Sequence, residues 1–149
     1  MTWILKKFEE LTVHELYAIL QLRNEVFSIE QNCIYPDLDD RDQPAVHLMG
    51  FANKKLVGYA RILPPGLVYD DPSIGRVVTA TSVRKTGVGK ELMHRSIEEC
   101  FNLYGNVNIT LSAQLYLKKF YESFGFKTCG DKYLEDGLEH IKMTRKFSR

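Results

Sequence analysis

Apolar residues recur along most of the chain in short runs and helical stripes, most clearly between positions 74 and 101. Residues 74–80 are rich in β-branched and apolar side chains, which is typical of a strand. Apolar positions then follow the 3.6-residue period of an amphipathic helix at Val88, Leu92, Met93, Ile97, Cys100 and Phe101. The pattern predicts a strand, a glycine-containing turn and a long helix, in that order.

The first half of the chain predicts a strand, a helix and a hairpin. Residues 3–8 form the first apolar run. Thr12, with Glu15 three residues later, matches the capping box that begins a helix. Two further apolar runs, 46–52 and 56–63, flank a short polar turn, and we therefore expect an antiparallel hairpin there.

The last third predicts one more strand, one more helix and a second hairpin. Residues 107–113 read as a strand, and residues 117–124 carry an aromatic face at helical spacing. Residues 126–134 and 138–147 flank an Asp-Gly pair, which strongly favours a tight hairpin turn. No linker, repeat or low-complexity tract interrupts this order.

Composition narrows the class of protein. A length of 149 residues suits one typical domain, spanning residues 1–149, and 44% hydrophobic with 26% charged residues is ordinary globular usage. A net charge of +1 gives no broad attraction to nucleic acid or to a membrane surface. Three cysteines, odd in number and without paired metal spacing, favour reduced thiols. We therefore expect a cytoplasmic protein with no metal, nucleic-acid or membrane partner.

The turn between residues 84 and 89 is a candidate phosphate site. Gly87 and Gly89 lack a Cβ atom, so backbone N–H groups can approach an anion, and the start of the helix adds its positive dipole end. A P-loop does not fit because its glycines are five apart, and the dinucleotide fingerprint fails because Leu92 replaces its third glycine. What remains is R-x-x-G-x-G, which fits either a phosphate cradle or a plain tight turn.

Together with F-Y-x-x-x-G-F at residues 120–126, this turn resembles the GNAT superfamily of N-acetyltransferases. Further stretches resemble its ElaA-like branch: Leu22-Arg23, Val26-Phe27, Glu30-Gln31, Tyr35 with Asp37 and Asp39, and Glu135-Asp136-Gly137 with His140. The resemblance runs from about Leu16 to Met143. It implies an α/β GNAT fold, with a mixed, mostly antiparallel central sheet of about seven strands flanked by helices. It also implies a parallel strand pair that splays apart at the cofactor site.

The resemblance further implies an N-acetyltransferase that uses acetyl-CoA and a primary amine in a ternary complex. Tyr121 is then the expected general acid for the departing thiolate, since an ordinary tyrosine pKa of about 10 keeps it protonated at neutral pH. The family pattern assigns pantetheine to the splayed strand and the diphosphate to the turn. The expected cofactor-binding residues are Val77, Val78, Thr79, Arg84, Lys85, Thr86, Gly87, Val88, Gly89 and Lys90.

The acceptor side is less constrained by the sequence. Residues 28–44 predict a loop whose aspartates form either a solvated turn or an acidic rim that attracts a cationic amine. Arg23 interrupts the first helix and either faces a cleft or lies in solvent. The expected substrate-binding residues, each with an ordinary structural alternative, are Gln31, Tyr35, Arg61, Arg76 and His140. Glu30 is the candidate general base, acting directly or through a water that Glu30, Gln31 or His140 holds.

Other functions stay open at the level of sequence. The acceptor is either a small-molecule amine or a lysine-bearing peptide, and the protein is either a monomer or a homodimer. A non-catalytic acyl-CoA-binding regulator that docks a partner protein is the alternative to an enzyme. The intact tyrosine of the aromatic helix favours the enzyme, because a pure binding protein does not need a general acid.

Overall fold

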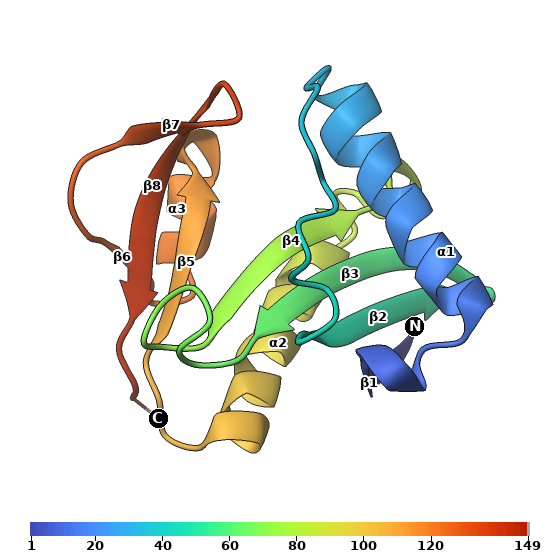
Figure 1. Cartoon of the computed structure of the whole chain (residues 1–149), viewed down its shortest axis with the longest axis horizontal. Coiled ribbons are helices and arrows are strands. Elements are labelled where there is room, and N and C mark those ends of the chain that lie inside the picture. Colours follow the sequence, from blue (N-terminus) through green and yellow to red (C-terminus); the bar gives the residue numbers. More distant parts are fainter. Residues whose placement is uncertain (149) are drawn as a thin grey trace.

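Two antiparallel sheets make up the β structure of the computed structural model, which describes residues 1–148 (Figure 1). The first sheet has the strand order β1 (Thr2–Lys7), β2 (Val46–Ala52), β3 (Lys55–Leu63) and β4 (Ser73–Thr79). The second contains β5 (Ile109–Gln114), β8 (Leu138–Arg145), β6 (Lys127–Thr128) and β7 (Tyr133–Glu135). The expected α/β arrangement is present, and residues 1–148 contain eight strands in two sheets where about seven strands in one sheet were expected.

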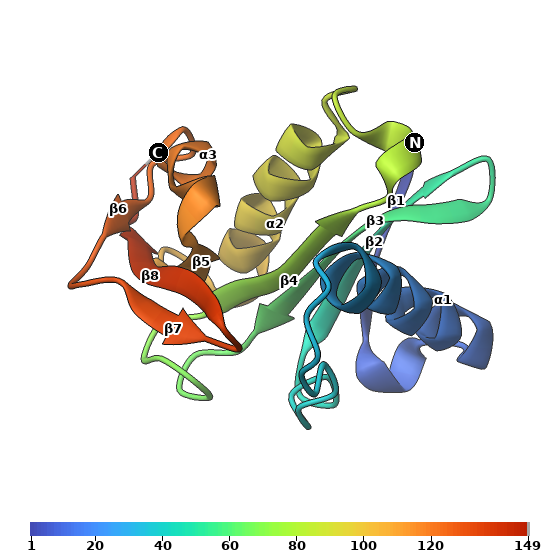
Figure 2. The same ribbon diagram turned by 90° about the horizontal axis from the view of Figure 1, so that it is seen from above.

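Helices cover both faces of the first sheet (Figure 2). Thr12 begins α1 (Val13–Arg23): its hydroxyl accepts from the Glu15 N–H at 3.1 Å, and the Glu15 carboxylate accepts from the Thr12 N–H at 2.9 Å. The capping box is therefore present. The remaining helical segments are η1 (Phe8–Glu10), η2 (Asn24–Glu30, a π-helix that continues α1), η3 (Thr81–Val83), α2 (Val88–Tyr104), η4 (Leu115–Leu117) and α3 (Lys118–Glu122).

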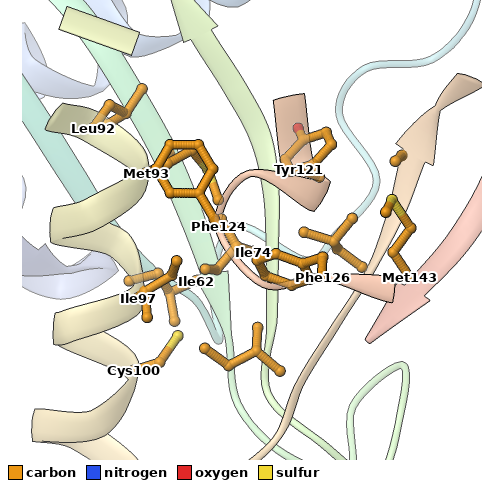
Figure 3. Packing of buried hydrophobic residues seen from close by; sticks show 14 of the residues in the cluster. Ile62, Ile74, Leu92, Met93, Ile97, Cys100, Tyr121, Phe124, Phe126 and Met143 are labelled. Atoms are coloured by element: carbon orange, nitrogen blue, oxygen red, sulfur yellow. The ribbon is translucent and has the colours of Figure 1, made fainter. Parts of the chain in front are cut away.

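The apolar stripe of α2 packs between the two sheets (Figure 3). Leu92, Met93 and Cys100 are fully buried there against Ile62 of β3 and Phe126. A second apolar cluster lies under α1 and contains Ile19, Leu22, Met49, Tyr59 and Val78. The first sheet is thus buried on both faces, which explains why successive residues of β2 and β3 are buried and mostly apolar instead of alternating between apolar and polar.

β4 contains a bulge in its pairing with β3. Tyr59 pairs with Val78 and Arg61 pairs with Gly75, so β4 has one more residue than β3 over this stretch. Arg76, within the extra segment, has a left-handed φ of 50°. A bulge bends its strand and increases the local twist. At their starts β4 and β5 lie close, where the Thr110 N–H donates to the Pro72 carbonyl at 3.1 Å, and they then diverge (Figure 1). The predicted splayed pair is confirmed.

Three predicted elements differ from the structure. The loop expected from residue 28 starts later, because η2 extends the first helix to Glu30. The helix expected over 117–124 is shortened to α3, because a 3₁₀ turn precedes it. The strand expected over 126–134 is split into β6 and β7, and Gly130 between them has a φ of 80°, which breaks the extended backbone.

Candidate active site

A cavity of about 620 Å³ lies where β4 and β5 diverge. Segments far apart in the sequence form its walls: η2, β4, β5, α3 and the turn between β7 and β8. Its lining includes these residues singled out from the sequence: Glu30, Gln31, Tyr35, Arg61, Arg76, Val77, Val78, Thr79, Arg84, Gly89, Tyr121 and His140. Lys85, Thr86, Gly87, Val88 and Lys90 belong to the adjoining turn and the start of α2.

One wall of the cavity is the edge of β4. β4 is the last strand of its sheet, and no ladder joins it to β5 within residues 1–148. An edge strand presents backbone N–H and C=O groups that have no partner strand. Val77, Val78 and Thr79 line the cavity along this edge, so their main chain can bind an extended amide-containing ligand there.

The turn before α2 provides space for an anion. Gly87 caps the helix with a φ of 91°, a backbone conformation that residues with a side chain rarely adopt. A Cβ atom built at Gly87 or Gly89 would meet nothing within 4 Å, so the backbone is open on that side. The N-terminal end of α2, a helix of 17 residues, carries partial positive charge. These features fit a diphosphate group.

Arg84 connects this turn to η2. Its guanidinium makes a bidentate ion pair with Glu30. Nη1 donates to Oε1, and Nη2 donates to Oε2 at 2.7 Å. Nη2 also donates to the Thr79 carbonyl at 3.2 Å. The hydrogen bonds from Arg84 lower the pKa of Glu30 below its ordinary value. Glu30 is therefore a weaker base in this arrangement than a free carboxylate.

Tyr121 lies in the wall opposite β4. The residue is only 7% exposed, and its ring makes edge contacts with Phe120 and Phe126 at centroid distances of 5.4 and 6.1 Å. Its oxygen points away from Phe126 and Ile74 in Figure 3. Burial raises the pKa of Tyr121 well above its ordinary value. The phenol is therefore protonated at neutral pH and can act as a proton donor.

Gln31 and Gln114 join η2 to β5 across the cavity. Each side-chain amide donates to the carbonyl oxygen of the other, at 3.4 and 3.3 Å. Tyr35 lies nearby, and burial raises the pKa of its hydroxyl to about 12. Gln114 was not identified from the sequence, because a glutamine at the end of a strand carries no pattern of its own.

A charged cluster lies next to the cavity and consists of three arginines and three aspartates. Arg23 donates to Asp37 at 2.9 Å and to Asp42 at 2.7 Å, and Arg61 donates to Asp42 at 2.9 Å. Arg61 also makes two bonds to Asp39, at 2.7 and 2.8 Å, and Arg76 donates to Asp37 at 2.8 Å.

This charged cluster corrects the predictions for the loop. Burial by itself would raise the pKa of Asp39, but the bonds and charge of Arg61 lower it to about 2. Asp37, Asp39 and Asp42 are neutralised by arginines, so neither the solvated turn nor the acidic rim describes them. Arg23 is fully buried, neither exposed nor in the cleft. Arg61 and Arg76 combine both expected roles, since they form ion pairs and line the cavity.

Removal of one carboxylate from this cluster should strongly destabilise the fold. We expect Asp42→Asn to lower the free energy of unfolding by about 3 kcal/mol or more, because it leaves two buried guanidinium groups without their shared counter-charge. Urea denaturation measures the change. Asp40→Asn is the matched control: Asp40 is exposed and has a φ of 62°, which asparagine also adopts. Equal stability of the two variants would contradict a structural role for Asp42.

Residues 1–148 contain neither a cluster of metal ligands nor a membrane-spanning helix. Their His, Cys, Asp and Glu side chains form no group of three or more that could hold a metal ion. No helix in the described part of the chain is long and apolar enough to cross a membrane. The thiols of Cys33, Cys100 and Cys129 are free.

Comparisons with known proteins agree with this fold. The family model of the acetyltransferase (GNAT) domain matches residues 17–147. Protein ElaA of Escherichia coli K12 is 42% identical over 139 residues, covering 92% of this chain and 91% of ElaA. The ElaA crystal structure superposes with a TM-score of 0.91 over 97% of this chain and 99% of that one. An acyl-CoA N-acyltransferase from Pseudomonas aeruginosa, 39% identical, gives a TM-score of 0.92 with the same coverage.

Proposed function

Because this chain belongs to the GNAT acetyltransferase family, we propose that it transfers the acetyl group of acetyl-CoA to a primary amine by direct attack in a ternary complex. The observation that carries the proposal is the open edge of β4, which faces the protonated phenol of Tyr121 across the cavity. The edge supplies fixed backbone donors, and the phenol supplies a proton. Both accelerate acyl transfer from a thioester.

Residues 84–90 are proposed to hold the diphosphate of acetyl-CoA. The open space beside Gly87 and Gly89 and the N-terminus of α2 support this assignment, with Arg84, Lys85 and Lys90 as nearby cations. Arg84 must exchange Glu30 for phosphate oxygens as the ligand enters. Holding the remote end of a substrate orients its reactive end, which makes the transfer effectively unimolecular.

The backbone of Val77 to Thr79 is proposed to bind pantetheine and to polarise the carbonyl. Bound acetyl-CoA supplies an acetyl group activated as a thioester. Backbone N–H groups on the β4 edge are fixed before the reaction and stabilise the negative charge that develops on the carbonyl oxygen. Tyr121 donates its proton to the departing sulfur. Since a thiol has a pKa of about 8.5, the sulfur needs only modest help to leave.

The acceptor amine is proposed to enter between Tyr35 and His140, on the side of the cavity formed by the β7–β8 turn. Gln31, Tyr35, Arg61, Arg76 and His140 line the cavity and are the proposed contacts of the acceptor. A small primary amine and the side chain of a lysine-bearing peptide both remain candidates. We place the activity in the cytoplasm, and the three free cysteines support a reducing compartment.

Release of coenzyme A tests the proposal. The protein is incubated with acetyl-CoA, with and without a panel of small primary amines and lysine-bearing peptides, and coenzyme A and the acetylated product are separated by chromatography. We expect at least one acceptor to yield both products in equal amounts. Binding of acetyl-CoA without any acceptor-dependent release would instead favour a non-catalytic acyl-CoA-binding regulator.

A further inference from the structure

We propose that His140 is the group that takes the proton from the acceptor amine, and that Glu135 is the positioning residue that holds the resulting imidazolium. This inference rests on the proposed function, in which no group has yet been assigned to accept the proton of the amine. Both side chains line the cavity. His140 lies in the middle of the second sheet, opposite Gln114 of β5 on one side and Tyr133 of β7 on the other.

The hydrogen bonds of His140 fix which nitrogen is basic. Nδ1 lies 2.9 Å from the Leu138 carbonyl oxygen, and a carbonyl oxygen only accepts, so Nδ1 carries the hydrogen. In the neutral ring, Nε2 then carries the lone pair. The ring is 7% exposed and stacks on Tyr133 with a centroid distance of 6.2 Å and an angle of 25°. The backbone and the stacked ring therefore hold the basic nitrogen in one orientation.

Glu135 lies where a proton on Nε2 would be stabilised. Its Oε2 is 3.4 Å from Nε2, while its side chain is about half exposed. A carboxylate at this distance is a partner for an N–H donor, so it can accept a hydrogen bond from a proton that Nε2 takes up. The pair can take up a proton and later release it to solvent through the exposed carboxylate.

Other charged and titratable groups surround this pair. Asp136 adjoins Glu135 at the turn, and Lys142 lies on the same face of β8 with its Nζ 5.3 Å from the centre of the Tyr69 ring. Arg76 and Arg41 also line the cavity, and Arg76 is bound to Asp37. Within the described residues, these cations therefore either lie farther from the Glu135 carboxylate than Nε2 of His140 does, or are already paired with another carboxylate.

Glu30 is the competing proton acceptor. Both of its carboxylate oxygens bind Arg84, which belongs to the turn proposed for the diphosphate, so Glu30 becomes available only when Arg84 moves to the phosphate oxygens. Among residues 1–148, His140 makes no ion pair with an arginine, and its Nε2 faces the Glu135 carboxylate. The pH profile of Glu30→Gln decides between the two candidates.

Atoms and charges balance in the proposed transfer. The neutral amine nitrogen forms a bond to the carbonyl carbon, and one N–H proton passes to Nε2 of His140. The C–S bond then breaks, and the sulfur takes the electron pair and the proton of Tyr121. The products are an amide and free coenzyme A, and solvent returns one proton from His140 to Tyr121.

His140→Asn tests the inference through the pH dependence of acceptor-dependent coenzyme A release. We expect kcat to fall about 10²- to 10⁴-fold, the usual effect of losing a general base, with acetyl-CoA affinity unchanged. The acid limb of the pH–rate profile should disappear, and added imidazole should restore part of the rate. Glu135→Gln should lower kcat about 10- to 100-fold, because the imidazolium loses a charge-assisted bond.

Glu139→Gln is the matched control, since Glu139 is the neighbouring carboxylate, faces away from His140 and pairs with Lys132 at 3.2 Å. It should keep the wild-type rate and profile. An acid limb that survives in His140→Asn but vanishes in Glu30→Gln would overturn the inference while leaving the proposed function intact. Wild-type protein that acetylates no acceptor would overturn both. If His140→Asn does not fold, Glu135→Gln decides, and a wild-type rate and profile in that variant would overturn the inference.

Discussion

Gly87→Asp is expected to weaken acetyl-CoA binding about 10³-fold. A carboxylate at this position would point into the open space where the diphosphate is proposed to lie. Two unit charges about 4 Å apart near a protein surface repel by about 4 kcal/mol, which corresponds to about three powers of ten in affinity. The φ of 91° adds backbone strain for any residue other than glycine. Isothermal titration calorimetry with acetyl-CoA measures the loss.

Gly105→Asp is the matched control for this variant. Gly105 ends the same helix and has a φ of 82°, and a Cβ atom added there would likewise meet nothing within 4 Å. The variant therefore introduces the same charge at the opposite end of α2, with at least as much backbone strain, because the ψ of −152° at Gly105 places it outside the left-handed helical region. We expect Gly105→Asp to retain acetyl-CoA affinity. Equal losses in the two variants would show that strain, and not the charge at the turn, explains the effect.

Tyr121→Phe is expected to lower kcat about 10²- to 10⁴-fold, the range typical for loss of a general acid. The variant removes one oxygen and keeps the ring that contacts Phe120 and Phe126, so the fold should persist. Affinity for acetyl-CoA should stay unchanged, because the diphosphate turn lies elsewhere. Single-turnover kinetics at saturating acetyl-CoA and acceptor isolate the chemical step.

Tyr104→Phe provides the comparison for Tyr121→Phe. Tyr104 packs against the same apolar cluster from the end of α2, and burial raises its pKa as well, but it does not line the cavity. Its loss of a hydroxyl should leave kcat near the wild-type value. If Tyr121→Phe also retained the wild-type rate, Tyr121 would serve in packing alone, and another proton donor would be required.

Local patterns predicted much of the fold. The capping box at Thr12, the stripe of α2 and the Asp-Gly hairpin turn depend on residues a few positions apart, so the sequence records them directly. The turn that we propose for the diphosphate was predicted for the same reason. Its glycines and the following helix are contiguous in the chain.

Features that depend on distant pairing were not predictable in this way. Arg84 and Glu30 are 54 residues apart, and the buried cluster joins α1, β3 and β4 to an irregular loop that has no periodicity. The bulge at Arg76 depends on the register between β3 and β4, which one strand cannot specify by itself. For Arg23 the sequence offered only a cleft or solvent, because its partners Asp37 and Asp42 lie 14 and 19 residues further along the chain.

A crystal structure with acetyl-CoA bound tests the central claim most directly, because that claim concerns where the thioester lies. We expect pantetheine along the edge of β4 at Val77 to Thr79, the diphosphate against Gly87 and Gly89, and the sulfur next to the Tyr121 hydroxyl. Arg84 should have left Glu30 for the phosphate oxygens. Acetyl-CoA bound outside the cleft between β4 and β5, or a complex in which these two strands have paired and closed the cleft, would contradict the account.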